Sequence, residues 1–253
     1  MKITSLNLQG FEHWEERKPK ILAYLRQESP DVVLFQEVVY LPELSAHNPA
    51  ELLNAELGYR YENCTISRLQ VGLEHPVYRE GLAAISRHPI LKTDTIVLKQ
   101  DERDAHQRIV QLLDIMINHH VVKIANVHFS ITDDFDFATP QLIELLDILQ
   151  ARGENRIIVG DFNLDRLEDS AELWQDRYRA STVFPYLSFP SWNKRNDYFL
   201  IPKSYEFSDF GTSGDAHLSD HTAITTTLAH SGDSHDWRRE LRERFAHLRD
   251  HAK

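Results

Sequence analysis

The most informative stretch of the sequence is 157-IIVGDFNLD-165, which begins as an apolar run and ends in polar side chains. The β-branched residues at 157–159 are typical of a buried strand. Asp161 and Asn163 follow at once, where an ordinary turn needs only turn-forming residues. A catalytic site needs polar groups held still by a rigid element, so the pattern raises the hypothesis that this strand ends in a site.

Several other strand-like segments carry polar side chains at one end. They are Asn7 after residues 3–6, Glu37 after 32–36, His128 after 121–127, Asp197 before 198–201, and Asp220 with His221 before 222–228. Taken singly, each has an ordinary explanation as a solvated carboxylate, a cap, a half-buried histidine or a turn former. Strand ends gathered on one rim would instead form a cleft of carboxylates, amides and imidazoles.

Length and composition favour one soluble α/β domain, since the chain has 253 residues with 42% hydrophobic and 26% charged residues. The start, MKITSLNLQG, alternates like a strand, so we expect neither a signal peptide nor a membrane span. Cys64 is the single cysteine, which excludes an internal disulfide and suggests a reducing, cytoplasmic location. The net charge of −11 disfavours a wholly basic nucleic-acid clamp, although a bound divalent cation inverts the local field.

Two helices carry clear start and stop signals. Residues 48–58 have Asn48 as the N-cap, Pro49 at the first helical position and Gly58 as the stop. Residues 139–153 repeat this device with Thr139, Pro140 and Gly153 around a stripe of Leu142, Leu145, Leu146 and Leu149. A further helix is expected between the first two strands, with Ile21, Leu22 and Leu25 on one face.

Strand-like runs dominate the rest of the chain, which predicts packed sheets flanked by helices. The runs lie at 3–8, 31–39, 81–87, 93–99, 107–117, 121–129, 156–160, 196–201 and 221–228. The domain is expected to span residues 1–229. Residues 230–253 are expected to form a separate amphipathic helical tail with a stripe of Trp237, Leu241, Phe245 and Leu248, through which self-association is possible.

The polar residues at the strand ends suit one chemistry. Glu37 with amide oxygens nearby suits Mg²⁺ or Mn²⁺, which prefer one or two carboxylates together with water and substrate phosphate. Two histidines with carboxylate neighbours suit acid–base work or donation to a phosphorus centre. The set has no dedicated nucleophilic serine or cysteine, and the chain has no Gly-rich phosphate loop. We therefore interpret the pattern as direct attack by water on a phosphate ester.

The same segments resemble the endonuclease/exonuclease/phosphatase (DNase I-like) superfamily from residue 1 to about residue 229. The motifs occur in the family's order: LNLQG, FQEV, EGLAAISRHPI, NVHFS, GDFNLD, SWNKRNDYFLI and LSDH. GDFN and SDH are each moderately specific, and their combination with QEV and NDYFLI is strongly specific. The resemblance implies a four-layer α-β-β-α sandwich of two packed mixed sheets, with the site at one edge.

The resemblance also implies a role for each matching residue. Glu37 corresponds to the principal Mg²⁺ ligand, with Asn7 beside it and Asp220 near the metal. Asp161 would orient or deprotonate the attacking water, and Asn163 would hold the phosphate. His221, oriented by Asp197, would stabilise charge on the phosphoryl oxygens, and His128 would do so from the other side.

Four positions at the border of the motifs depart from the family pattern or have two alternative roles. Gln9 stands where many DNA-repair members carry an acidic residue, which puts a second carboxylate ligand and abasic-site endonuclease activity in doubt. Arg79 and Arg108 fall where family members often place a phosphate-binding or structural arginine, and a packing or surface role is an equal alternative. Trp192 is a candidate for the border of the substrate cleft, with packing as its alternative.

The sequence as a whole predicts a Mg²⁺-dependent hydrolase of phosphate esters, most simply a phosphodiesterase. Nucleic acid, a lipid head group and an inositol phosphate all remain open as its substrate. The family uses one type of site for all three, and fold resemblance does not choose among them. A nuclease or DNA-repair phosphodiesterase is one alternative, which would need a basic face beside the cleft. A non-catalytic binding protein with a vestigial site is another, and the filled motif positions oppose it.

Overall fold

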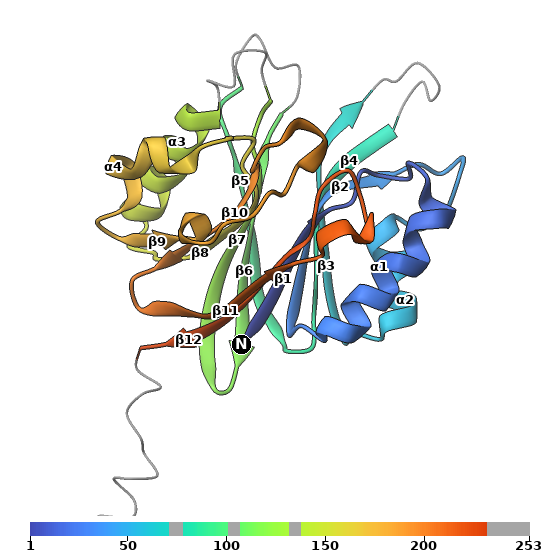
Figure 1. Cartoon of the computed structure of the whole chain (residues 1–253), viewed down its shortest axis with the longest axis horizontal. Coiled ribbons are helices and arrows are strands. Elements are labelled where there is room, and N and C mark those ends of the chain that lie inside the picture. Colours follow the sequence, from blue (N-terminus) through green and yellow to red (C-terminus); the bar gives the residue numbers. More distant parts are fainter. Residues whose placement is uncertain (71–77, 101–106, 132–137, 232–253) are drawn as a thin grey trace, which may run out of the picture.

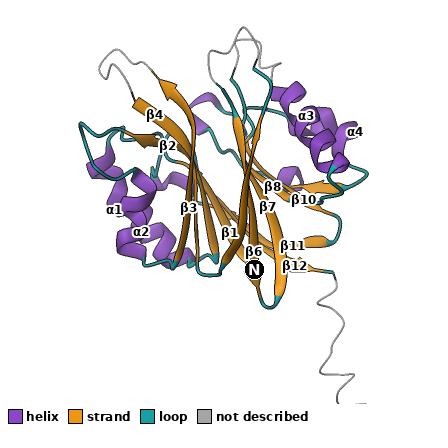
Figure 2. Cartoon of the chain, turned by 180° about the vertical axis from the view of Figure 1, so that it is seen from behind, coloured by secondary structure: helices purple, strands orange, loops and turns teal. Residues whose placement is uncertain are grey.

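The computed structural model describes residues 1–70, 78–100, 107–131 and 138–231. Two six-stranded sheets pack face to face, and helices cover their outer faces (Figures 1 and 2). Helices α1 and α2 lie on one side of the sandwich, and α3 and α4 lie on the other. The predicted four-layer α/β sandwich of two mixed sheets is therefore confirmed.

The first sheet has the strand order β11-β12-β1-β2-β4-β3. Its strands are β1 (Lys2–Asn7), β2 (Val32–Tyr40), β3 (Tyr61–Gln70), β4 (Tyr78–Ser86), β11 (Tyr205–Thr212) and β12 (Ile224–His230). Strands β1 and β2 are parallel, and the other pairings in this sheet are antiparallel. Helix α1 (Trp14–Glu28) connects the parallel pair as a βαβ unit.

The second sheet has the order β5-β6-β7-β8-β10-β9. Its strands are β5 (Ile90–Val97), β6 (Ile109–Ile117), β7 (His120–His128), β8 (Ile157–Asp161), β9 (Tyr178–Ala180) and β10 (Asp197–Pro202). Strands β7 and β8 form its parallel pair, and α3 (Ala138–Ala151) connects them. Each sheet thus contains one βαβ unit near its centre.

The helices follow the sequence signals closely. Helix α2 (Pro49–Leu57) begins with a capping box between Asn48 and Glu51, and it ends at Gly58 in the left-handed conformation. Helix α3 buries the predicted leucine stripe, but it already includes Ala138, so Thr139 lies inside the first turn and does not cap it. Short helices complete the chain: α4 (Ala171–Trp174) and the 3-10 turns Leu167–Ser170, Ser181–Val183, Pro190–Trp192 and Gly214–Ala216.

The space between the sheets divides into levels along the strands. Near the starts of β1, β2, β7 and β8 this space is apolar. It contains Ile3, Val32, Leu34, Leu113, Ile124, Ile157, Val159 and Phe199. Inward-facing polar residues replace these side chains toward the ends of β1, β2, β7 and β8. The apolar level stabilises the pairing of the sheets, and the polar level holds the site residues.

The chain leaves the first sheet after β12. This strand continues through His230, and the Ser231 amide donates to the Ser204 carbonyl at 2.8 Å. The predicted tail helix lies outside the described residues from position 232 onward. Within the described ranges, no helix combines the length and the apolar character needed to cross a bilayer.

Candidate active site

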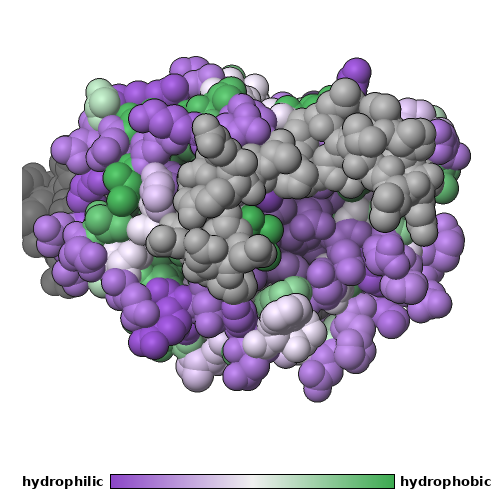
Figure 3. Space-filling model, turned by 90° about the horizontal axis from the view of Figure 1, so that it is seen from above, coloured by the Kyte–Doolittle hydropathy of each residue, from purple (hydrophilic) through white to green (hydrophobic). Residues whose placement is uncertain are grey.

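The two βαβ units bring four of the predicted site residues to one end of the sandwich. Asn7 ends β1 and Glu37 lies near the end of β2, while His128 ends β7 and Asp161 ends β8. Carboxyl ends of parallel strands lie at the same edge of a sheet, so each unit contributes one half of the site. The described surface at this end is largely hydrophilic (Figure 3).

Glu37 reaches the site through an irregularity in β2. The pairing of β2 with β4 shifts between Phe35 and Val38, so that two residues of β2 occupy the space of one. Glu37 adopts a left-handed backbone with φ of 50°, which is uncommon outside glycine. Such a bulge re-aims a side chain, and here it accompanies the turn of Glu37 toward the site.

Asp161 depends on the glycine that precedes it. Gly160 has φ of 139°, and a Cβ atom there would lie 2.1 Å from the Val127 carbonyl oxygen. Strands β7 and β8 pair at this point with Val127 opposite Gly160 and His128 opposite Asp161. A side chain at position 160 would therefore separate His128 from Asp161.

Asp161 is buried at the centre of the site. Its Oδ1 accepts the Asn163 amide at 2.9 Å, and its Oδ2 accepts the Asn7 Nδ2 at 3.1 Å. The Nε2 atoms of His128 and His221 lie 3.6 and 3.7 Å from the same Oδ2. Burial, followed by the charge of nearby Asp197, raises the pKa of Asp161 to about 7. The charge of His221 and the hydrogen bonds that Asp161 accepts from Asn163 and Asn7 lower the pKa, but they do not outweigh the burial.

His221 is held by Asp197 from the neighbouring strand. The Nδ1 of His221 lies 2.7 Å from Asp197 Oδ2, and both side chains are buried. Burial lowers the pKa of the imidazole, but the charges of Asp197 and Asp161 and the hydrogen bond to Asp197 outweigh it and raise the pKa to about 10. His221 is consequently an imidazolium near neutral pH, with Nδ1–H directed at Asp197 and Nε2–H facing Asp161.

The donor set fits a hard divalent cation. Glu37 leaves 34% of its side chain exposed and accepts Asn7 Nδ2 at 3.1 Å. Burial of the carboxylate, followed by the charge of Glu80, raises the pKa of Glu37. Asp161, Asp197 and His221 also place ligand atoms within 4.8 Å of one another, but an imidazolium at His221 has no free nitrogen lone pair for a metal. Asn7 Nδ2 lies 3.1 Å from both Glu37 Oε1 and Asp161 Oδ2, so two carboxylates lie close together, and such hard oxygen ligands are those that Mg²⁺ or Mn²⁺ prefers.

Asn7 and Asn163 use their amide groups inside the site. The Nδ2 of Asn7 bridges Glu37 and Asp161, and its Oδ1 accepts the backbone N–H of Gln9. Asn163 has φ of 50° and donates from Nδ2 to the Phe129 carbonyl at 2.8 Å. Asn7 therefore links the halves of the site, and Asn163 fastens the loop after β8 to the loop after β7.

The loop that carries Asp220 is tied to the loop after β1. The Gln9 Oε1 accepts the Asp220 backbone N–H at 3.3 Å, and the Asp220 side chain accepts the Ser219 hydroxyl. Buried Arg17, which sequence analysis missed, donates to the carbonyls of Leu8, Gln9, Gly10, Glu12 and Leu218. Its only sequence signal is a charged residue on the buried face of α1, so its anchoring role needed the structure.

The two predicted arginines take different positions. Buried Arg108 lines a small cavity of about 10 Å³ together with His128 and Glu80. Glu80 was not singled out in the sequence, although it acts on Glu37 through its charge. Arg79 is exposed and follows the alternation of β4, so its side chain lies on the opposite face of the sheet from Glu80. The structure thus brings Arg108 close to His128 and leaves Arg79 apart from this cavity.

Trp192 connects to the site through another aromatic ring. It is 67% exposed in the 3-10 turn Pro190–Trp192, and its ring is nearly parallel to that of Phe189 at a centroid distance of 6.5 Å. The Phe189 ring lies 4.7 Å from the His221 ring. Trp192 therefore lies on the imidazole side of the site and connects to His221 through the Phe189 ring.

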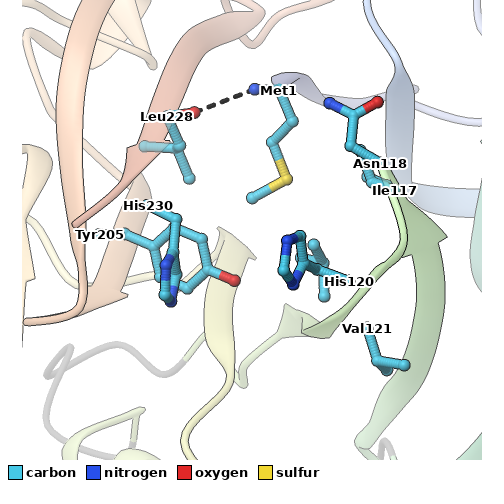
Figure 4. A pocket seen from close by; sticks show the side chains of 9 residues that line it. Met1, Ile117, Asn118, His120, Val121, Tyr205, Leu228 and His230 are labelled. Atoms are coloured by element: carbon cyan, nitrogen blue, oxygen red, sulfur yellow. Dashed lines mark hydrogen bonds between the residues drawn. The ribbon is translucent and has the colours of Figure 1, made fainter. Parts of the chain in front are cut away.

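A larger cavity of about 190 Å³ lies at the other end of the strands (Figure 4). It is lined by residues from strand starts and turns, including Met1, His120 and Tyr205, and the Met1 ammonium group donates to the Leu228 carbonyl at 2.9 Å. Met1 and His120 begin segments that end at Asn7 and His128. This cavity is therefore separated from the candidate active site by the length of the strands.

A two-sheet sandwich with carboxylates, amides and imidazoles on one rim defines a hydrolase of phosphate esters. The sequence model of the endonuclease/exonuclease/phosphatase family matches residues 4–221. The chain belongs to this family. A search among curated proteins found no match.

Solved structures share the fold at low sequence identity. An endonuclease/exonuclease/phosphatase from Beutenbergia cavernae aligns with a TM-score of 0.73 and 18% identity, over 91% of this chain and 71% of that one. The human Nocturnin catalytic domain with bound sulfate gives 0.69 and 20%, over 91% and 94%. Sphingomyelinase C from Streptomyces griseocarneus gives 0.64 and 18%, over 89% and 98%. These similarities establish the fold, and the residues of this chain must provide the argument for its reaction.

Proposed function

We propose that the protein is a Mg²⁺-dependent phosphodiesterase in which water attacks the phosphorus atom directly. The observation that carries the proposal is the environment of Asp161 Oδ2, which lies 3.6 Å from His128 Nε2 and 3.7 Å from His221 Nε2. A buried carboxylate between two imidazoles, beside the partly open Glu37, can receive a proton while the imidazoles donate to phosphoryl oxygens.

Asp161 acts as the base in this proposal. Its pKa of about 7 lies close to neutral pH, which is the value at which a general base combines proton affinity with a deprotonated resting state. Asn7 and the Asn163 amide hold the carboxylate in one orientation. Asp161 therefore orients water and takes its proton as the oxygen–phosphorus bond forms.

The imidazoles stabilise the charge that develops on phosphate. His221 presents Nε2–H as a charged donor because Asp197 holds its opposite nitrogen at 2.7 Å. His128 Nε2 lies 3.6 Å from the same Asp161 Oδ2 and is a second candidate donor. Loss of one preorganised donor of this type typically reduces turnover by about 10² to 10³.

Glu37, with Asn7 and Asp220 nearby, would hold the cation. A bound Mg²⁺ supplies charge neutralisation and polarisation of the phosphoryl group. Glu37→Gln should weaken Mg²⁺ binding measured by calorimetry by at least about tenfold and leave the melting temperature largely unchanged. The exposed Glu172→Gln change is the matched control, and equal Mg²⁺ affinity in the two variants would contradict the assignment of Glu37.

The substrate is best identified by a hydrolysis screen with Mg²⁺. The panel contains duplex and single-stranded nucleic acid, sphingomyelin vesicles, inositol phosphates and nucleotide diesters, each with and without EDTA. The net charge of −11 favours a small or singly engaged phosphate ester over long duplex DNA. A steep salt dependence of duplex binding, with a slope corresponding to about six phosphates, would favour a nuclease instead.

We further propose that the expected domain of residues 1–229, extended by His230 and Ser231 at the end of β12, forms the catalytic unit and that it acts in the cytoplasm. The single cysteine, Cys64, rules out an internal disulfide, and a chain without disulfides fits a reducing location. Fractionation of cells that express the tagged chain tests this location.

A further inference from the structure

A chain of buried amides lies directly beneath the candidate active site. Gln36 Nε2 donates to Asn126 Oδ1 at 2.7 Å, and Asn126 Nδ2 donates to Gln111 Oε1 at 3.0 Å. Gln111 Nε2 then donates to Asn63 Oδ1 at 2.8 Å, and Gln36 also bonds Ser5. The contacts cross from the first sheet to the second and back again, in a space whose lower level is apolar.

The amide chain is in register with the site residues. Side chains alternate between the two faces of a strand, so residues two apart share a face. Ser5 precedes Asn7 by two positions on β1, and Asn126 precedes His128 by two positions on β7. Gln36 directly precedes Glu37 at the bulge of β2. The amides therefore form the level on which the site residues rest.

Asn126 also contacts the backbone of the bulge from the opposite sheet. Its Nδ2 lies 3.2 Å from the Phe35 carbonyl oxygen and 3.3 Å from that of Ala83. Phe35 and Ala83 form the last regular pair before the β2–β4 register shifts. Asn126 thus connects His128 on its own strand with the backbone that turns Glu37 into the left-handed conformation.

A network of this kind has a physical cost that apolar packing would avoid. Buried amides stabilise a structure only when their partners are present, and a half-satisfied network is worse than an apolar core. Each hydrogen bond requires a particular distance and direction between its two amides. A network of them is therefore compatible with only one arrangement of the two sheets. At this level, the arrangement determines the distance between Asn7 and Glu37 on one side and His128 and Asp161 on the other.

We propose that Asn126 and Gln36 are positioning residues that hold the Glu37 bulge against the second sheet and thereby determine the geometry of the cation site. The proposal rests on the proposed function for its catalytic consequence. The positioning of the Glu37 bulge does not depend on the proposed function, because it concerns the backbone of the metal-free protein.

The test compares three variants of the full chain. Asn126→Leu removes the donors to Phe35 and Gln111, and Gln36→Met removes the bond to Asn126 while leaving those donors in place. Thr225→Val is the control, because it removes buried hydroxyl contacts with Thr4 and Tyr24 of 2.8 Å each on the helix side of the first sheet. Asn126→Ser replaces Asn126→Leu if the latter does not fold.

We expect Asn126→Leu to weaken Mg²⁺ affinity and lower kcat by about 10- to 100-fold, as is typical of residues that orient a metal ligand. Gln36→Met should have a smaller effect in the same direction. In the metal-free protein, hydrogen exchange should accelerate at the amides of Leu8 and Gly10, which donate to the carbonyls of Gln36 and Glu37. Thr225→Val should lower the melting temperature without changing these three readouts.

Equal Mg²⁺ affinity, kcat and local exchange in Asn126→Leu and Thr225→Val would overturn the proposal and leave the amides a purely structural role. If the unaltered protein neither binds Mg²⁺ nor hydrolyses any ester, the proposed function fails. Faster exchange at Leu8 and Gly10 in Asn126→Leu would still support positioning in that case, and unchanged exchange would refute it.

Discussion

Asp161 and Asp197 lie directly opposite one another on the antiparallel strands β8 and β10. Two like charges in such a pair destabilise a sheet unless a cation compensates them. His221 lies between them, with Nδ1 2.7 Å from Asp197 and Nε2 3.7 Å from Asp161. The imidazolium therefore forms its close ion pair with Asp197. Asp161 is less well compensated, so its proton affinity stays high.

Replacing Asp197 should remove the ion pair that keeps His221 protonated. In Asp197→Asn, His221 loses the charge that holds its pKa high, and the amide can favour the wrong tautomer. We expect kcat to fall by about 10² to 10⁴ and the His221 pKa, measured by NMR titration, to fall. The exposed Asp176→Asn change is the control. A titration of His221 equal to that of the unaltered protein would show that Asp197 does not perform this function.

Asp161 should reduce the stability of the metal-free protein at neutral and alkaline pH. Its pKa is raised to about 7 in the folded chain, so folding favours the protonated form. This contribution to stability is complete below the unfolded pKa of about 4 and disappears as pH rises through 7.

In EDTA at pH 8, Asp161→Asn should therefore raise the melting temperature by about 5 °C. In a separate assay with Mg²⁺ present, the same variant should have lost hydrolysis. The gain should vanish near pH 4, where both versions carry a neutral side chain. Calorimetric scans of the two proteins at the two pH values provide the check. A gain that does not depend on pH would contradict the titration of Asp161 as its cause.

Arg17 should be replaceable only at a large cost. Its guanidinium donates to five backbone carbonyls in the loops after β1 and before β12. A lysine has three donors on one nitrogen and cannot satisfy these directions. Arg17→Lys should lower the melting temperature by about 5 to 10 °C. Arg26→Lys on the exposed side of α1 is the control, and similar melting temperatures for both variants would refute the anchoring role.

The C-terminal segment should matter for stability or association. The tail lies outside the described residues, and its expected stripe of Trp237, Leu241, Phe245 and Leu248 would expose a large apolar surface if it stood alone. Truncation should follow Ser231, because β12 includes His230 and Ser231 is bonded to Ser204. We expect a lower melting temperature or a smaller oligomer in sedimentation. No change in stability, solubility or size would contradict packing on the domain and on a second copy alike.

Local sequence signals were sufficient for the central elements of the fold. The cap at Asn48 and the stop at Gly58 act within a few residues, so sequence reveals them directly. The leucine stripe of α3 packs on distant strands, but its helical spacing is visible in the sequence. Strands β3, β9 and β11 were missed. In β11 the alternation of Tyr205 and Phe207 is broken before Phe210 by a register shift between Phe207 and Asp209, and no residue of this edge strand is fully buried.

Sequence patterns also located the strand ends of the site but not the devices that aim the side chains. The left-handed backbone of Glu37 depends on the pairing of β2 with β4, and nothing in FQEV encodes it locally. Asn126 and Gln111 look like ordinary surface residues by type. Their burial depends on partners 91 and 48 positions away, Phe35 and Asn63, which a single sequence does not reveal.

The two βαβ units have a kinetic consequence for how the protein matures. Each unit closes over a short length of chain, whereas the Asn7–Asp161 contact joins residues 154 positions apart. Contacts distant in sequence form late because the entropy of closing the loop must be overcome before they stabilise anything. Neither unit contains a complete site, so we expect a refolding chain to regain its helices and its βαβ units while it is still inert. Catalytic competence then appears when the two sheets dock.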